Sequence, residues 1–140
     1  MIRKAVKSIL AASVGISSIV SKRIYADFAP QGATLPFVVF KTIAATRVDA
    51  LTKSSGLVNA TVMVELFSRT VSQLVTLSGD VREALYRFSG TAAGVKIQGT
   101  ELTNEFSDDE LEMAGSDRRI RRQIMDFSIW YEETPIAVHS

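Results

Sequence analysis

The stretch Arg23–Leu57, RIYADFAPQGATLPFVVFKTIAATRVDALTKSSGL, holds the signals that decide the fold. Pro30, Gly32 and Pro36 interrupt regular structure, because proline fixes φ and glycine permits positive φ. Phe37–Phe40 is a short apolar run next to these residues, which is typical of a buried strand. The stretch contains no paired nucleophile and base, no glycine-rich phosphate loop and no metal-ligand spacing. It therefore specifies architecture rather than catalytic chemistry.

Hydrophobic periodicity outward from this stretch predicts two helices and five strands. Residues 3–20 carry apolar side chains mostly at three- and four-residue steps, which is typical of an amphipathic helix. Thr70 or Ser72 is placed to cap a second helix, and Gly90 lies where that helix should stop. The expected elements are a helix over residues 3–20, strands over 22–25, 36–46 and 57–68, a helix over 70–89, and strands over 95–105 and 118–133.

The order α-β-β-β-α-β-β predicts an α+β fold, in which two main α-helices pack on an antiparallel β-sheet. Residues 26–35 and 47–56 are expected as loops, and residues 105–117 as a loop or a short solvent-facing turn of helix. We expect a single domain over residues 1–140, with 134–140 as a flexible tail. A chain of this length buries roughly two-thirds of the surface that it exposes when unfolded.

Residue alternation also predicts the faces of the elements. In residues 57–68, the even positions from Val58 to Leu66 are apolar and should face the core. The strand over 36–46 has apolar side chains on both faces, including Ile43, so both faces should be buried. The apolar stripe expected on the second helix consists of Val71, Leu74, Val75, Val81, Leu85 and Phe88.

The last strand separates its two aromatic residues. Tyr131 falls on the apolar face with Phe127 and Ile129, so it is expected in the core. Trp130 shares its face with Asp126 instead. Core packing and a role as an interface anchor are both open for Trp130.

Composition excludes several kinds of chemistry. The 140 residues are 46% hydrophobic and 22% charged, with a formal net charge of +1, so nothing global favours nucleic-acid binding. The chain has no cysteine, and its single histidine is His139, so disulfides, thiolate catalysis and histidine-based sites are not expected. The apolar stretch Ile9–Val20 is interrupted by serines and is too short and polar to span a bilayer. We expect no enzyme activity, no cofactor, no metal and no membrane partner.

The densest carboxylate group consists of Asp108, Asp109, Glu110 and Glu112. Hard cations such as Ca²⁺ need several oxygen ligands. This spacing lacks the alternating acids and central glycine of an EF-hand loop, so a solvated segment is the favoured interpretation.

The sharpest basic cluster, Arg118, Arg119, Arg121 and Arg122, directly follows the acidic segment. On a strand, the first and last of these point one way and the middle two the other. Arginine binds phosphate in bidentate fashion, so contact with DNA is one interpretation. The favoured one is pairing with the acidic segment, within the chain or across a subunit boundary. The candidate subunit–subunit contacts are the four arginines, Trp130, and the acids Asp108, Asp109 and Glu110.

An ordered set of short motifs points to a family. Arg23-Ile24-Tyr25, Pro30-Gln31-Gly32, Pro36-Phe37-Val38-Val39 and Leu51…Gly56-Leu57 follow one another, and Asp126-Phe127-Ser128-Ile129-Trp130 comes later. In this order they resemble the tail-completion, or tail-terminator, proteins of long-tailed bacteriophages and prophages. The resemblance extends over most of the chain and is strongest over residues 20–68.

That resemblance implies a structural role in the virion, with host cytoplasm as the site of assembly. Members of the family form a hexameric ring on the head-proximal end of the tail tube and stop its polymerisation. The ring then offers a surface to the head-completion (stopper) protein, and genomic DNA passes through its hole without sequence-specific binding. In this chain, Val48, Asp49, Leu51 and Lys53 are the candidate contacts with the tube or the stopper.

Three alternatives stay open from the sequence. The chain is another neck component, such as a stopper or head-completion protein, or a tube-like subunit. It is a cellular α+β adaptor. It is a metal-dependent hydrolase that uses the acidic segment, which the absence of cysteine and the single terminal histidine disfavour.

Overall fold

The computed structural model of the chain describes residues 2–49, 54–88, 90–112 and 119–132. Its helices are α1 (Ile2–Ala12), α2 (Val14–Val20) and α3 (Val71–Arg87). Its strands are β1 (Ile24–Ala26), β2 (Phe37–Asp49), β3 (Ser54–Ser68), β4 (Gly90–Ala92), β5 (Val95–Glu112) and β6 (Arg119–Glu132). The fold is therefore α+β, as the sequence predicts. The element order differs, because the first helix is divided and the short strand β4 precedes β5.

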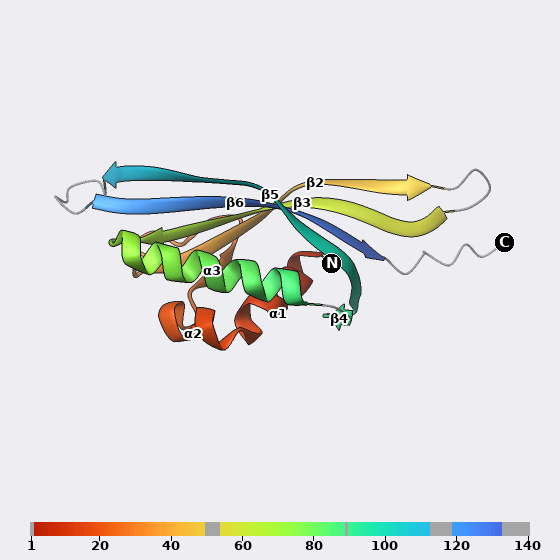
Figure 1. The fold of residues 1–140 in the computed structure, drawn as a ribbon, viewed down its shortest axis with the longest axis horizontal. Helices are drawn as coiled ribbons and strands as arrows, with labels where there is room; N and C mark the ends of the chain where they lie inside the picture. The colour runs from red at the N-terminus through yellow and green to blue at the C-terminus, as the bar shows by residue number, and fades with distance from the viewer. Residues whose placement is uncertain (1, 50–53, 89, 113–118, 133–140) are drawn as a thin grey trace.

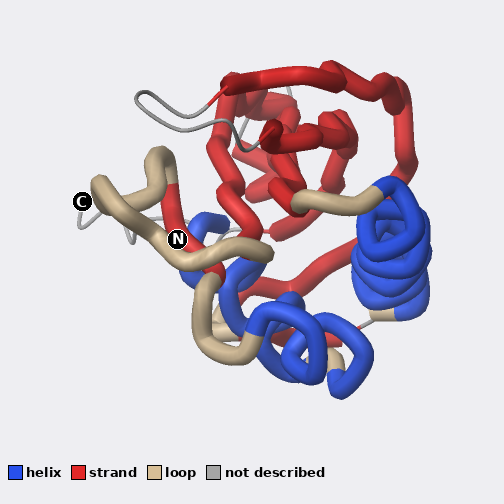
Figure 2. The backbone as a smooth tube through the Cα atoms, turned by 90° about the vertical axis from the view of Figure 1, so that its left-hand side faces the viewer, coloured by secondary structure: helices blue, strands red, loops and turns tan. Residues whose placement is uncertain are grey.

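The strands form one sheet in the order β1-β2-β3-β6-β5-β4, and the described helices lie on one side of it (Figure 1). Four of the neighbouring pairs are antiparallel, but β1 runs parallel to β2, so the expectation of a purely antiparallel sheet is wrong. A tight hairpin turn cannot join parallel strands, and residues 27–36 form the longer connection between β1 and β2. Viewed from its end, the sheet is strongly curled (Figure 2).

The main core fills the space between the sheet and the helices. Even-numbered residues of β3 and odd-numbered residues of β6 point into it, which confirms the predicted alternation. Phe40 and Phe127 are the largest side chains that are fully buried there, and Tyr131 is 2% exposed. Burying an aromatic side chain of this kind contributes about 1.5–3 kcal/mol, so these positions hold the helices on the sheet.

The single helix expected over residues 3–20 is two helices in the structure. Ser13 lies between them with extended backbone, and its Oγ accepts a hydrogen bond from the backbone N–H of Ile16 at 3.2 Å. This is an N-cap, which starts α2 in a new direction. Gly15 lets α2 approach α3, because a Cβ built at this position would lie 2.7 Å from Cγ of Asp80.

Helix α3 confirms its predicted start and part of its predicted stripe, since Leu74, Val81 and Leu85 are buried. Thr70 is the N-cap, with its Oγ1 accepting from the backbone N–H of Gln73 at 3.2 Å. Val71 and Val75 are exposed, at 51% and 64%. The face of α3 that packs on the sheet is rotated from the expected one, and its buried residues are Leu74, Leu77, Ser78, Val81 and Leu85.

Two segments expected as loops belong to long hairpins instead. The polar segment 47–56 is mostly strand, because β2 runs to Asp49 and β3 resumes at Ser54. The acidic segment expected as a loop over 105–117 is strand as far as Glu112. Pairing with the neighbouring strand decides both cases, and local composition does not report it. The two hairpins, β2–β3 and β5–β6, end on opposite sides of the molecule (Figure 1).

Strand β2 is buried on both faces only in its first half. Residues Phe37–Phe40 are all buried, as expected. A bulge between Thr42 and Ala44 then shifts the alternation, and Ile43 is 54% exposed. A bulge of this kind changes which side chains face the core, which explains why the expectation for Ile43 is wrong.

Candidate functional site

The end of the β2–β3 hairpin carries the residues expected to meet the tube or the stopper. Asp49 is opposite Ser54 in the strand register, next to the pair Val48 and Leu57. Leu51 and Lys53 lie outside the described residues, as do the side chains of Val48 and Asp49. The structure therefore places this candidate contact at the far end of a hairpin.

The opposite end of the sheet brings the acidic and basic groups together. Asp108 is paired with Arg122 in the register between β5 and β6, and Glu112 is paired with Arg119. Oppositely charged residues on facing strands attract, so this register agrees with pairing inside one chain. Outside the described part of the chain lie Arg118 and the side chains of Asp108, Asp109, Glu110 and Arg119.

Arg122 also reaches across the sheet to a buried acid. Its Nη1 donates to Oε2 of Glu65 at 3.2 Å, and Nζ of Lys41 lies 2.9 Å from Oε1 of the same carboxylate. The side chain of Glu65 is only 6% exposed. A buried carboxylate is costly unless it is paired and hydrogen-bonded. The two cations meet that need and connect β2, β3 and β6 through one residue.

Apolar side chains surround this ion group on the face away from the helices. The rings of Phe37 and Phe67 stack at 4.7 Å between centroids, and Tyr25 meets Phe37 edge-on at 6.0 Å. Val39 and Ile124 are buried although they are not part of the main core. The second face of the sheet thus has a small packed cluster of its own.

Farther along this face, Trp130 lies in a shallow hollow of about 460 Å³. Trp130 is 40% exposed, on the polar face of β6 as the sequence predicts. The hollow is lined by Leu57, Gln98, Gly99, Trp130 and Glu132. Beside it, Nδ2 of Asn59 donates to Oγ of Ser128 at 2.7 Å, which fixes the strands around the indole.

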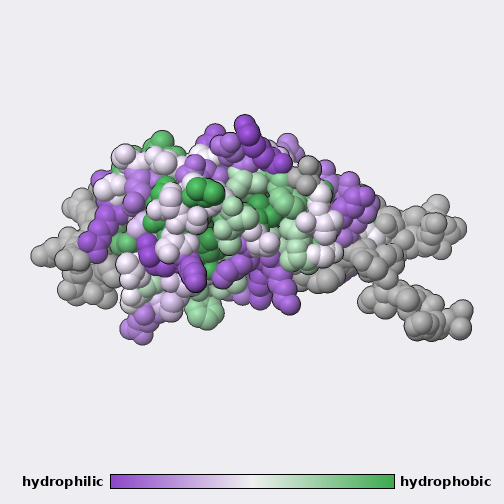
Figure 3. Space-filling view, turned by 90° about the horizontal axis from the view of Figure 1, so that it is seen from below, coloured by the Kyte–Doolittle hydropathy of each residue, from purple (hydrophilic) through white to green (hydrophobic). Residues whose placement is uncertain are grey.

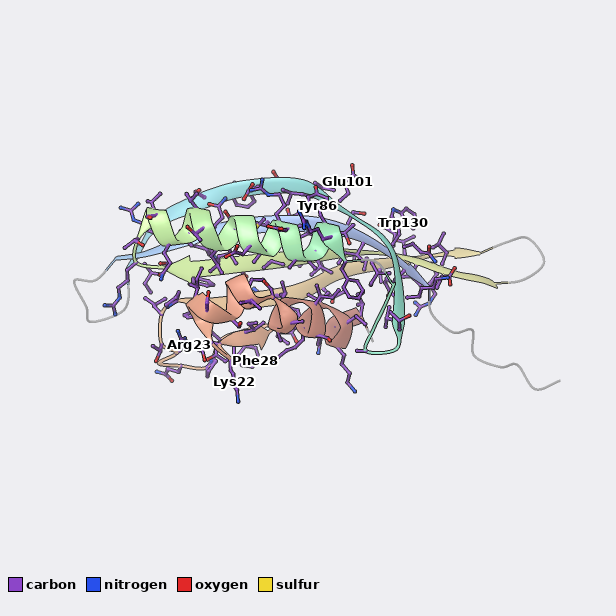
Figure 4. The ribbon with its side chains drawn as sticks, turned by 60° about the horizontal axis from the view of Figure 1, so that its bottom comes forward. Lys22, Arg23, Phe28, Tyr86, Glu101 and Trp130 are labelled. Atoms are coloured by element: carbon purple, nitrogen blue, oxygen red, sulfur yellow. The ribbon has the colours of Figure 1, made fainter. Side chains whose placement is uncertain are left out.

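A different surface lies at the β1 edge of the sheet. The first 23 residues contain five basic residues and no acidic one. Phe28 follows β1 and is 77% exposed, close to Lys22 and Arg23 in Figure 4. The same view shows Tyr86, Glu101 and Trp130 on the other side of the molecule (Figure 4).

The helical side of the molecule has a groove and small apolar patches among its described residues. A groove of about 540 Å³ between α1, α2 and α3 is lined by small and charged residues, among them Gly15, Asp80 and Arg87. Apolar patches on this face are small and separated by hydrophilic ones (Figure 3). Within the described parts of the chain, no three of the residues His, Cys, Asp and Glu are grouped so as to hold a metal ion. None of the described helices is long and apolar enough to cross a membrane.

Sequence reasoning missed two features. Glu65 and Lys41 are isolated charges in otherwise apolar strands, which was a signal for a buried ion pair. Phe28 is an aromatic residue inside a turn-rich segment, where a core position is not expected. The two isolated charges do not show which residues pair, because Lys41, Glu65 and Arg122 lie on strands that are distant in the sequence.

A comparison with known protein families found a match over most of the chain. A family model described as tail completion protein gp17 matches residues 4–132. No curated protein sequence is significantly similar to the chain.

Among solved structures, the fold matches a chain of the "Virion of native gene transfer agent (GTA) particle". The TM-score is 0.73 at 16% sequence identity, and the match covers 92% of each chain. At this identity the likeness concerns the fold.

Proposed function

This chain belongs to the tail completion protein gp17 family, and from that premise we propose that it is the terminator of a phage-type tail. It is a structural protein of the virion tail. The proposed role is a ring of six copies that caps the head-proximal end of the tail tube. There it stops polymerisation of the tube and presents a surface to the head-completion protein.

The observation that carries this proposal is the position of the two long hairpins at opposite ends of one sheet (Figure 1). A ring on a tube needs contacts with other virion proteins as well as contacts between neighbouring copies. The β2–β3 end, with Val48, Asp49, Leu51 and Lys53, is suited to the tube or the stopper. The β5–β6 end, with its acidic and arginine strands, is suited to a neighbouring copy.

The proposed mechanism uses shape and association and includes no reaction. Capping requires that the ring bind the last tube subunits and leave no surface to which another tube subunit adds. DNA then passes through the opening, where contacts that are independent of base sequence allow it to move. The role needs neither a catalytic residue nor a cofactor.

Deletion of the gene tests the proposal directly. Particles assembled without the protein should show tails that are longer than normal and lack heads, because nothing stops the tube. Electron microscopy of negatively stained lysates measures both features. Supplying the protein from a plasmid should restore tail length.

A parallel deletion of the stopper gene is the control. Loss of a stopper should leave headless tails of normal length, since the tube is already capped. Normal-length tails in the absence of this protein would reject the terminator role and favour another neck component.

A further inference from the structure

We infer that Phe28 of one copy inserts into the hollow around Trp130 of the next copy, with Lys22 facing Glu101. This inference rests on the proposed ring, since it names the surfaces through which neighbouring copies meet. A closed ring needs two different surfaces on each copy that fit one another. The sheet order puts β1 at one edge and β5 toward the other, so the two surfaces lie on different sides of the chain (Figure 4).

The projecting surface is held in a fixed shape. Asp27 has a positive φ of 71°, its backbone N–H donates to the carbonyl of Phe40 at 2.8 Å, and its carboxylate pairs with Arg3 at 3.2 Å. The backbone N–H of Phe28 donates to the carbonyl of Ala26 at 2.9 Å. These bonds present the ring of Phe28 to solvent before any partner arrives, which lowers the entropy lost on binding.

The receiving surface is apolar at its centre and acidic near its margin. Trp130 and Leu57 line the hollow, and Gly99 has no side chain to fill it. Glu132 lies at the hollow, where Nζ of Lys96 is 3.9 Å from its Oε2, and Glu101 comes two residues after Gly99 along β5. An exposed aromatic ring and an apolar hollow with acidic neighbours match an aromatic anchor with adjacent cations.

Lys22 and Glu101 are the charges that the two surfaces leave for a partner. Most charged residues near these surfaces have partners within the chain: Arg3 pairs with Asp27 at 3.2 Å, Glu105 with Arg82 at 3.9 Å, and Asp108 and Glu112 are opposite Arg122 and Arg119 in the strand register. Among the described residues, neither Lys22 nor Glu101 has an ion-pair partner within the chain. A basic residue beside Phe28 and an acidic residue near the hollow favour head-to-tail contact between copies, because opposite charges attract.

Extension of the sheet from one copy to the next is not the mode of contact at these positions. The carbonyls of Ile24 and Ala26, on the side of β1 away from β2, already accept from Nζ of Lys7 at 3.0 Å and from the N–H of Phe28 at 2.9 Å. On β5, the N–H of Leu102 already donates to Oη of Tyr86 at 2.7 Å. These three backbone groups are satisfied within the chain, and the proposed contact is made by side chains.

Cross-linking in assembled tails tests the pairing. The chain has no native cysteine, so Ala29→Cys combined with Gln98→Cys gives two defined attachment points beside the contact and leaves Phe28 and Trp130 in place. A short bismaleimide should join copies into a ladder that ends at the closed ring on a denaturing gel. Each single variant should stay monomeric, because one kind of surface does not meet itself in a head-to-tail ring.

The matched control is Ala29→Cys combined with Val75→Cys, since Val75 is 64% exposed on α3 and outside the hollow. It should give no ladder. A monomer band alone for the Ala29 and Gln98 pair, or an equal ladder for the control, overturns the inference. If the tails are nevertheless of normal length, the terminator role stands and only the contact is wrong.

Charge exchange tests the second part of the contact. Lys22→Glu and Glu101→Lys should each lower the yield of cross-linked ring at least threefold, and the double variant should restore it. No rescue in the double variant rejects the pairing. If Lys22→Glu weakens binding to linear double-stranded DNA but leaves the ring unchanged, the basic edge is a nucleic-acid surface and the inference is wrong.

Discussion

Nη1 of Arg122 lies 3.2 Å from Oε2 of Glu65, joining β6 to β3 on the face of the sheet away from the helices. Lys41 of β2 binds the other carboxylate oxygen at 2.9 Å. One buried acid thus holds three adjacent strands together between the two hairpin ends. In the proposed ring, this group keeps the surfaces for the tube and for the neighbouring copy in a fixed relation.

Replacing Glu65 tests this group. Glu65→Ala leaves two cations over a buried site and should lower the free energy of unfolding by about 3 kcal/mol. Urea denaturation followed by circular dichroism measures the change. Glu101→Ala is the matched control, because Glu101 is exposed on a neighbouring strand and should shift stability by no more than about 0.5 kcal/mol. Equal effects of the two substitutions would show that the ion group does not stabilise the sheet.

Gly15→Ala should destabilise the protein although alanine favours helix. The added Cβ would lie 2.7 Å from Cγ of Asp80, so either that side chain or α2 must move. We expect a loss of about 1 kcal/mol instead of the gain of about 1 kcal/mol that helix propensity alone predicts. In an Asp80→Ala background the same substitution should become stabilising. A double-variant cycle by thermal unfolding measures this change of sign.

Thr70→Ala should cost about 1 kcal/mol, because it removes the side chain that caps α3. Thr76→Ala in the same helix is the control, since its Oγ1 only bonds to the carbonyl of Ser72 and the position is exposed. That control should be neutral or slightly stabilising. A cost at Thr76 as large as that at Thr70 would mean that the cap is not the cause.

Deleting residues 49–54 should leave a folded monomer and prevent tails from joining heads. The deletion removes the end of the β2–β3 hairpin, and the main core lies elsewhere in the sheet. Circular dichroism checks folding, and electron microscopy of complemented lysates counts joined particles. Normal joining by the deleted protein would show that the hairpin end does not meet another virion protein.

Reversing Arg119 and Arg121 to Glu should weaken the ring, and more so at low salt, where charge repulsion is least screened. The two arginines lie at the start of β6, at the end of the sheet opposite the β2–β3 tip. Sedimentation in solution at two ionic strengths measures the mass of the oligomer. An unchanged mass at both would remove these arginines from the subunit contact.

The features that the sequence predicted correctly depend on residues that are close together in the chain. Thr70 as a cap, the alternation of β3 and β6, and the buried run Phe37–Phe40 each depend on neighbours within a few residues, and all three were predicted. The candidate contact residues were also named from sequence. Their side chains lie largely outside the described residues, so those assignments stay predictions.

Other features needed contacts between distant parts of the chain. The division of the first helix depends on Ser13 as a cap and on the fit of Gly15 against Asp80, which no periodicity in residues 3–20 reveals. The extension of β5 through the acidic segment depends on β6 as a partner. The exposure of Ile43 depends on a bulge in the pairing of β2 with β3.

By itself, the sequence determined the α+β class, the inward faces of β3 and β6 and the family, because local periodicity and short ordered motifs carry that information. Only the tertiary structure decided the parallel pairing of β1 with β2, the burial of Glu65 and the placement of Phe28 and Trp130 on different sides. Each of these depends on which strands become neighbours in the sheet. That choice is made by packing between segments far apart in the chain, which local patterns do not record.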